Sequence, residues 1–472
     1  MAGNGRFRAW EGTVMSTAGP NPWRVLGVLC IANFLVLLDT TIVNTAVPDL
    51  MTRLDVGIGE ILWILNGYLL ALASLLVFFG RLGDLAGPRR LFVLGLAVFT
   101  LASALCGLAD DPAWLIAARV AQGIGAAILS PQAFVLIAAI FPPARRGAAF
   151  GLFTAVAGIA AISGPTLGGL LVTEFGWQSV FLLNVPVGLA GIVLALRVVP
   201  DARTGRPHRF DVVGVLLVTA GLVGVVYGLI EKAGTVEGFA VAIVALTAFV
   251  LWERGRKDPL IPLGLYRDRG YRIATVLTGA TAFSIAGFLL VFVLLTQNLL
   301  GMSPLMSGVA ALPWTLALSA VAPVAGRLAD RFGGRWLLVG GLALYAAGVA
   351  ATALLPDETS TAAVFLAPLI AVGVGQGLAI APATTEALRA IPPDTVGAAS
   401  GVLNTARHVG SALGAAVSGV LFQAGLADGE LAAARTTFLV LAVVLAAAAL
   451  LAVRIPARTT ESHRPSTESV AV

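Results

Sequence analysis

The feature that most constrains this chain is a succession of apolar runs, each of about 18 residues or more, separated by short breaks that carry charge, proline or glycine. Inside a bilayer no water is available to backbone N–H and C=O groups, so such runs satisfy them internally as α-helices. Hydrophobic residues make up 58% of the 472-residue chain and charged residues only 12%, about half the charged fraction of a soluble protein. The sequence therefore predicts an all-α integral membrane protein.

We predict about fourteen membrane spans. They occupy residues 25–47, 61–80, 91–109, 113–141, 147–172, 178–199, 211–230, 236–253, 271–296, 304–326, 336–355, 362–388, 397–424 and 435–453. With this count, Lys and Arg lie almost entirely on the N-terminal side of the membrane, and the exceptions are Arg53, Lys232, Arg435 and, within spans, Arg119 and Arg407. The positive-inside rule then predicts a cell (plasma or inner) membrane protein with both termini in the cytoplasm.

Two short motifs occur twice in the chain. Residues 80–84 (GRLGD) recur as 326–330 (GRLAD), and residues 147–151 (GAAFG) recur as 397–401 (GAASG), at offsets of 246 and 250 residues. Parallel halves around a central cavity are the architecture of many secondary transporters. We predict a cytoplasmic N-terminal segment (1–23), an N-terminal six-helix bundle (24–200), a linker with two extra transmembrane helices (201–262), a C-terminal six-helix bundle (263–455) and a disordered cytoplasmic tail (456–472).

Two ionisable residues lie inside predicted spans at similar depth. Asp39 is about two thirds of the way through the first span, where a charged group facing lipid costs on the order of 3 kcal/mol. Arg119 lies near the outer end of the fourth span, within a few ångströms of the same depth. An arginine beside a carboxylate favours its ionised form, so proton release would respond to whatever separates the two. We predict a proton-coupling pair, and a static ion pair remains the alternative.

Two further motifs suggest moving parts. Residues 80–90 (GRLGDLAGPRR) form a turn in which glycines permit a tight reversal, and Asp84 with Arg89 and Arg90 can bridge helix ends. An ordinary loop that only sets topology is the alternative. The fifth span, with small residues at three- and four-residue spacing, contains Pro165, which frees a carbonyl group and kinks a helix. Physics alone does not separate close helix packing there from a gating hinge.

These motifs resemble those of the major facilitator superfamily, in particular its drug:proton antiporters with fourteen spans, over about residues 24–455. The matching segments are 38–48 in span one, 80–90 in the loop, 119–123 in span four, 151–169 in span five and 211–217 at the first extra span. The chain departs from the pattern at Ala160, where a glycine is usual, and at Ser179, where a tryptophan is usual. Neither departure changes an ionisable group.

The resemblance implies two six-helix bundles plus two extra central helices, and export of a substrate as protons enter. It assigns proton coupling to Asp39 and Arg119. It assigns gating to Gly80, Asp84, Gly87, Arg89, Arg90, Gly164, Pro165 and Asp330. Because the span-four counterpart in the second half lacks an arginine, coupling is expected in the N-terminal half.

Several residues on inward spans are candidates for a substrate cavity, although packing is the favoured explanation for each one individually. They are Phe34, Trp63, Asn66, Gln122, Asn184, Phe283, Phe288, Trp314 and Asn404. Arg407 is predicted to be a second buried cation with a structural or gating role, and His408 to be structural. Glu386 is the nearest acidic residue to Arg407, but it lies a turn or more too shallow.

The predicted function is proton-driven efflux of amphiphilic small molecules, often cationic or aromatic, of the multidrug or antibiotic resistance type. No cofactor is expected, and the chain is expected to act as a monomer in the lipid bilayer without binding nucleic acid, because its basic residues are scattered. Cys30 and Cys106 lie in apolar runs and predict neither a metal site nor a disulfide framework. No hydrolase motif or ion filter is present. A dedicated exporter or facilitator of one metabolite, and a non-transporting sensor of this fold, remain alternatives.

Overall fold

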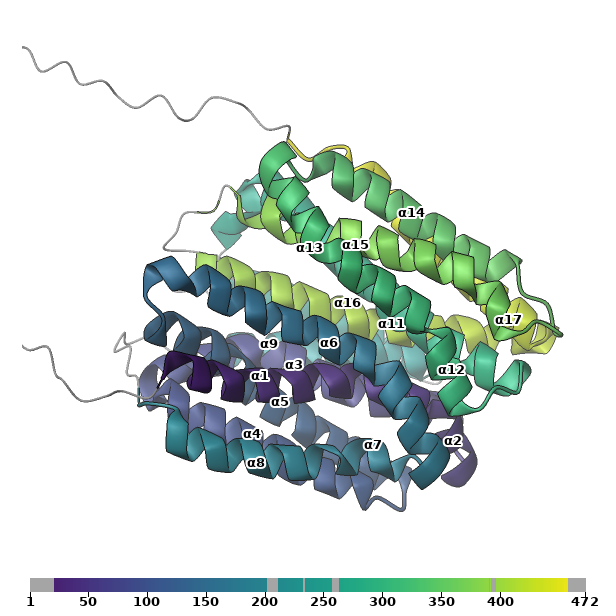
Figure 1. The fold of residues 1–472 in the computed structure, drawn as a ribbon, viewed down its shortest axis with the longest axis horizontal. Helices are drawn as coiled ribbons and strands as arrows, with labels where there is room; N and C mark the ends of the chain where they lie inside the picture. The colour runs from purple at the N-terminus through teal and green to yellow at the C-terminus, as the bar shows by residue number, and fades with distance from the viewer. Residues whose placement is uncertain are drawn as a thin grey trace, which may run out of the picture.

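The structure is a computed structural model that describes residues 21–201, 211–231, 234–256, 263–389, 391 and 396–456. Within these ranges, some side chains of α3, α6, α13 and α16 are not described. Most of the predicted N-terminal segment, almost all of the predicted C-terminal tail and parts of the linker lie outside the described residues. The long helices run roughly side by side along one axis of the molecule (Figure 1).

The described residues form helices and no strands. In chain order they are α1 (Pro22–Thr45), α2 (Val47–Arg53), α3 (Ile58–Ala86), α4 (Pro88–Gly107), α5 (Pro112–Ile140), α6 (Pro143–Phe175), α7 (Gln178–Leu182), α8 (Asn184–Val198), α9 (Val212–Ile230), α10 (Thr235–Arg254), η2 (Leu263–Arg267), α11 (Arg269–Leu294), η3 (Leu295–Leu299), α12 (Pro304–Ala310), α13 (Leu312–Phe332), α14 (Arg335–Leu354), η4 (Ala362–Phe365), α15 (Leu366–Leu388), α16 (Val396–Gly425), η5 (Leu426–Asp428) and α17 (Glu430–Ala452).

Thirteen helical segments in the described ranges are long and apolar enough to cross a membrane. The 33-residue helix α6 falls between the fourth and fifth of these segments and is about 50 Å long, so it supplies the remaining predicted span. The sequence-based prediction of an all-α membrane protein with about fourteen spans is confirmed. The predicted limits of each span agree with the helices to within a few residues, except that α3, α13 and α17 extend about five or six residues further at one end.

Side-chain caps begin several of the helices. A polar residue just before the helix accepts a hydrogen bond from a backbone N–H of the first turn, which has no partner within the helix. The donor–acceptor pairs are Trp23 N to Asn21 in α1, Trp114 N to Asp111 in α5, Tyr271 N to Asp268 in α11 and Met306 N to Ser303 in α12. These caps fix where the chain turns back into the membrane.

The two halves repeat the same close helix contacts. In the N-terminal half, Gly125 of α5 lies against the backbone of Phe99 in α4. In the C-terminal half, Gly375 of α15 lies against the backbone of Tyr345 in α14. In both places a Cβ would overlap the facing backbone, so glycine is required for the approach. The offsets of 250 and 246 residues equal those of the repeated sequence motifs.

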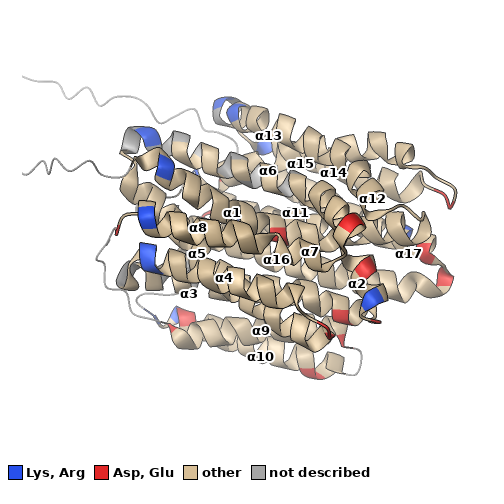
Figure 2. Cartoon of the chain, turned by 60° about the horizontal axis from the view of Figure 1, so that its bottom comes forward, with Lys and Arg blue, Asp and Glu red and all other residues tan. Residues whose placement is uncertain are grey.

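The charged residues divide between the two ends of the bundle. Figure 2 shows Lys and Arg gathered at the end where α1 begins, and Asp and Glu mainly at the end where α1 stops. We call these the basic end and the acidic end. Arg89, Arg90 and Arg197 lie at the basic end, whereas Asp49 and Asp111 lie at the acidic end. Successive loops lie at alternate ends of the bundle, so the basic loops gather at one end and the acidic loops at the other.

The two extra helices, α9 and α10, form a hairpin whose basic end is fastened through Asp211. Asp211 caps α9, and its Oδ1 atom accepts from Gly214 N at 2.9 Å and from Trp252 Nε1 at 2.8 Å. Arg256 Nη2 lies 3.4 Å from the same oxygen. Burial acts to raise the pKa of Asp211, but these hydrogen bonds and the Arg256 charge outweigh it and hold the pKa below its usual value.

Asp211→Ala should lower the stability of the protein at neutral pH by about 1–2 kcal/mol, the usual worth of such a cap. Because the folded-state pKa of Asp211 is depressed, its charge adds stability above the unfolded-state pKa, near 4. That contribution is lost as the pH falls through the lower folded-state value. Thermal unfolding of wild type, Asp211→Ala and Asp211→Asn, compared between neutral and acid pH, tests the loss of the cap with the alanine variant and the loss of the charge with the asparagine variant. An unchanged difference in acid contradicts the assignment.

Candidate functional site

The ion pair predicted from the sequence forms inside the N-terminal half. Arg119 Nη1 of α5 lies 2.5 Å from Asp39 Oδ2 of α1. The two residues are 1% and 0% exposed. Both lie about 10 Å from the acidic ends of their helices, since each is roughly six or seven residues from that end. A charge pair desolvated to this extent must be matched by further polar contacts.

Two amides and a hydroxyl complete the surroundings of Asp39. Gln122 Nε2 and Asn184 Nδ2 donate to Asp39 Oδ1 at 2.8 and 3.2 Å. Both amides also donate to Ser103 Oγ, at 3.1 and 2.9 Å, and Arg119 Nη1 donates to Gln122 Oε1 at 2.6 Å. Gln122 and Asn184 were predicted to line a substrate cavity. In this conformation both are 0% exposed and bind the carboxylate instead.

Aromatic rings and a carbonyl group hold Arg119 from the other side. Its Cζ lies 4.4 Å from the centroid of the Tyr68 ring and 5.7 Å from that of Phe181. Its Nε donates to the Ile64 carbonyl oxygen at 3.2 Å. A cation over an aromatic face is stabilised by the ring quadrupole. The guanidinium therefore keeps favourable contacts even when its partner carboxylate is neutral.

Three side chains direct hydrogen-bond donors at the Asp39 carboxylate. Arg119 donates to one of its oxygens, and Gln122 and Asn184 donate to the other. A proton on Asp39 removes the charge attraction and puts an O–H where an acceptor stood. At least one N–H donor must then turn away. Because these donors lie on α5 and α8, protonation would alter how α1 packs on both helices.

Glycines of α6 and α12 bring the two halves together at the acidic end. Gly169 of α6 faces the carbonyl oxygen of Pro304 in α12, and Gly308 of α12 faces the carbonyl oxygen of Pro165 in α6. A Cβ at either glycine would overlap the backbone of the other half. Pro165, predicted to act in gating, therefore lies in the seam between the halves.

Two hydrogen bonds cross between the halves at the same end. Gln297 Nε2, in the π-helical turn η3, donates to the Thr45 carbonyl oxygen at 3.2 Å. Leu305 N donates to Thr173 Oγ1 at 3.2 Å. Together with the glycine contacts they close the acidic end of the bundle in this conformation.

The helix that carries Asp39 packs on the same helix that forms the seam. Gly164 of α6 lies against the hydroxyl of Thr41 and the backbone of Ile42, and Gly168 lies against Ile42 one turn later. A Cβ at either glycine would overlap side-chain atoms of α1. A change in the position of α1 would therefore alter its contact with α6.

The loop motif of the first half turns at Gly87, whose φ of 93° is a conformation that glycine adopts readily. Gly80 faces the side chain of Pro131 in α5, and a Cβ at this position would lie 3.6 Å from it, in ordinary van der Waals contact. Arg89 Nη2 donates to the carbonyl oxygen of Leu196 at the end of α8 at 2.5 Å, and Arg90 is exposed. The side chains of Asp84 and Asp330 lie outside the described residues, so their gating roles stay predictions.

Two predicted cavity residues of α3 make other contacts. Trp63 Nε1 donates to Glu231 Oε1, at the end of α9, at 3.0 Å. Asn66 is buried, and its Nδ2 donates to the Leu62 carbonyl oxygen at 2.8 Å. Trp63 therefore fastens the extra hairpin to the N-terminal half at the acidic end.

Two of the aromatic residues predicted to line a cavity in the second half are fully packed instead. Phe288 is 0% exposed and its ring centroid lies 5.4 Å from that of Trp314. Trp314 Nε1 donates to Gln376 Oε1 at 3.0 Å. These two residues belong to the packed core of the C-terminal half and do not line a cavity in this conformation. The remaining candidates, Phe34, Phe283 and Asn404, are half-buried.

Arg407 was predicted to be buried, and this is wrong, because its side chain is exposed. Its Nη1 donates to Asn404 Oδ1 at 3.2 Å, and the neighbouring His408 is half-buried. Glu386 instead pairs with Arg389 and accepts from Gly334 N at 2.5 Å, in the second copy of the loop motif. Depth in a span does not show which side of the helix a residue occupies, and burial depends on that side.

Sequence reasoning missed Ser103 and Tyr68. Ser103 is a small polar residue in the third span with no motif around it, and only its contacts with Gln122 and Asn184 give it a role. Tyr68 offers its ring to Arg119 and its hydroxyl, through a 3.2 Å hydrogen bond, to the Val36 carbonyl oxygen. An aromatic residue in an apolar run gives no signal of such a contact.

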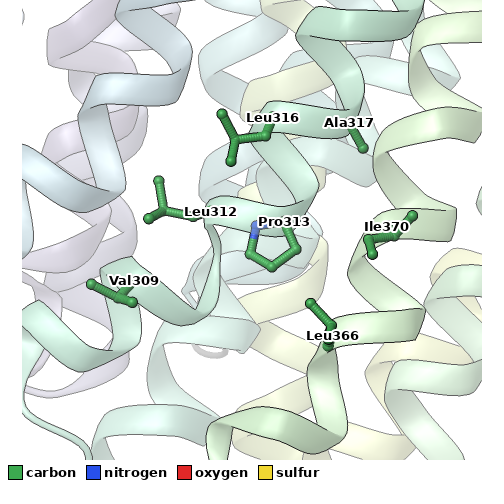
Figure 3. Close-up of a pocket in the computed structure, with 7 residues that line it drawn as sticks. All are labelled: Val309, Leu312, Pro313, Leu316, Ala317, Leu366 and Ile370. Atoms are coloured by element: carbon green, nitrogen blue, oxygen red, sulfur yellow. The ribbon is translucent and has the colours of Figure 1, made fainter.

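A groove of about 470 Å³ lies away from this network, between α12, α13 and α15 (Figure 3). It is lined by Val309, Leu312, Pro313, Leu316, Ala317, Leu366 and Ile370. None of these side chains carries a charge or a hydroxyl group. The groove therefore offers apolar contact only, on the surface of the C-terminal half.

A membrane-spanning bundle of two repeated halves, closed on one side by helix contacts and carrying a desolvated ion pair in one half, has the architecture of a secondary transporter. The sequence matches the family model described as Major Facilitator Superfamily over residues 29–415 and 275–471, and the chain belongs to this family. The family is one of transporters, so the chain is not an enzyme but a multi-pass membrane transport protein.

Relatives and a solved structure agree with this assignment. The chain is 37% identical over 417 residues to the tetracenomycin C resistance and export protein of Streptomyces glaucescens, covering 86% of this chain and 77% of that protein. It is 36% identical over 401 residues to the multidrug resistance protein Stp of Mycobacterium tuberculosis, covering 83% and 74%. A crystal structure of a bacterial homologue of the human lysosomal transporter Spinster matches with a TM-score of 0.66, at 17% identity, over 92% of this chain and 97% of that chain, which shows the shared fold.

Proposed function

We propose that this protein is a proton-coupled exporter that moves amphiphilic small molecules out of the cell by alternating access. The observation that carries the proposal is the buried Asp39–Arg119 pair, because Asp39 lies on α1 and α1 packs on glycines of α6, the helix that forms the seam between the halves. Protonation of Asp39 and binding of substrate would favour different arrangements of the same two halves, which couples their free energies. The names of the two relatives, one of them an export protein, support the direction of transport.

The basic end is assigned to the cytoplasm, which puts both termini there, because Lys and Arg favour cytoplasmic loops. The conformation described here is then closed toward the outside. Protons would reach Asp39 from the outside, near the acidic end, when the contacts between α6 and α12 separate. Substrate would enter from the cytoplasm in the conformation seen here.

The test is transport by the purified protein in proteoliposomes. An imposed gradient of about 1 pH unit corresponds to 1.4 kcal/mol per proton, enough for roughly tenfold accumulation of a neutral substrate exchanged for one proton. Collapse of the gradient with an ionophore should abolish accumulation. Movement of substrates that is indifferent to the gradient would identify a facilitator and refute proton coupling.

A second candidate is a dedicated exporter of one metabolite, which is favoured by the relative named for the single compound tetracenomycin C. The same assay separates the two, because a panel of cationic, neutral and acidic amphiphiles is moved broadly by a multidrug exporter. A dedicated exporter leaves nearly the whole panel untouched.

A further inference from the structure

The helix α16 carries a polar stripe along one face. Ser400, Asn404, Arg407 and Ser411 recur at intervals of three or four residues and therefore share one side of the helix. The opposite side carries Val402, Val409, Leu413 and Val420. The apolar side is packed into two hydrophobic clusters, one within the C-terminal half and one that includes residues of both halves, whereas Arg407, on the polar side, is exposed.

The stripe faces the space between the halves. Gly410 and Gly414 of α16 point toward α11 of the same half, and Gly419 points toward Leu62 of α3 in the other half. Successive residues of an α-helix are rotated by about 100° around its axis, which places the stripe between the side of α16 that faces α11 and the side that faces α3. Arg407 is roughly eleven residues into a 30-residue helix, so it lies near the middle of the membrane. A polar face at this depth belongs in the bundle interior and not against lipid.

Arg407 offers an unneutralised positive charge to that space. Asp39 and Arg119 neutralise each other and are buried. In the described part of the chain, the only polar partner of the Arg407 guanidinium is the neutral oxygen of Asn404. A guanidinium has five N–H donors in a fork that matches the two oxygens of a carboxylate. Most of these donors are therefore available to a ligand.

We propose that Arg407 is a specificity-determining residue that binds substrates carrying a carboxylate or a similar oxyanion on an aromatic or apolar body. This deepens the proposed function and rests on it, since it names the substrate class of the same transporter. It also replaces the expectation of cationic substrates, because an exposed arginine repels a cation and attracts an anion.

The test uses two dyes that share a xanthene body, anionic fluorescein and cationic rhodamine 6G. Their binding to the purified protein in detergent is measured without any gradient by fluorescence anisotropy. Wild type should prefer fluorescein. Arg407→Gln should weaken fluorescein binding about tenfold or more, the size of one charge-assisted contact, and leave rhodamine 6G binding unchanged or stronger. Arg407→Lys should recover part of the loss, because it keeps the charge without the fork.

Arg254→Gln is the matched control, because it removes one exposed positive charge from α10, away from the stripe, and should change neither affinity. Equal loss of both dyes, no loss of fluorescein, or a wild type that binds only rhodamine 6G would each overturn the assignment of Arg407. Proteoliposome transport of the same dyes is scored separately. Arg407-dependent fluorescein binding with gradient-indifferent transport would refute proton coupling and leave the substrate class intact.

Discussion

Asp39→Asn is expected to reduce gradient-driven accumulation of substrate to the level of empty liposomes. The amide has nearly the shape of the carboxylate but cannot take up or release a proton in this pH range, so the driving reaction is removed while the helix remains. Downhill movement of substrate can persist, because it needs only the exchange of the two conformations. The measurement is uptake with and without a gradient of about 1 pH unit.

Stability has to be separated from coupling in this variant. Removal of one partner from a buried ion pair leaves the other charge uncompensated and costs about 3–5 kcal/mol. The aromatic and carbonyl contacts of Arg119 reduce that figure here. The double variant Asp39→Asn/Arg119→Gln is neutral and should unfold at a higher temperature than Asp39→Asn, yet remain uncoupled. Gradient-driven accumulation by either variant would show that Asp39 does not carry the proton.

Gly169→Val should lower transport by roughly tenfold or more by disfavouring the closed acidic end. Its Cβ would overlap the backbone of Pro304 in the other half, which cannot rotate away as a side chain can. Overpacking of this kind costs about 1–3 kcal/mol, which shifts an equilibrium between two conformations by about 5- to 150-fold. The readout of conformation is disulfide cross-linking of Thr173→Cys with Leu305→Cys, whose wild-type residues share a hydrogen bond across the seam.

The control for this variant is Gly27→Val in α1, where an added Cβ meets no atom within 4 Å. It makes the same chemical change in a membrane span and should leave transport and cross-linking near wild type. If Gly169→Val cross-links as efficiently as wild type, the seam tolerates the side chain. The contact between α6 and α12 would then not control the closed state.

The depth of a residue within its membrane span predicted some contacts of the site but not others. Asp39 and Arg119 are rare charges in apolar runs at matching depth, so their pairing was foreseeable. Gln122 and Asn184 were recognised as polar residues facing inward, but not as donors to Asp39. Neutral polar residues are common in spans, and the partner of each depends on how far its helix is rotated.

The sequence by itself determined the number of spans, the two repeated halves and the presence of a buried ion pair. These follow from the length of apolar runs, the distribution of Lys and Arg and the cost of a charge in lipid. Only the tertiary structure decided which helices meet through Gly164 and Gly169, and that Arg407 is exposed in the interior. Lipid and the protein interior are both apolar, so hydropathy does not determine how far a membrane helix is rotated about its axis. Packing within and between the two halves determines that rotation.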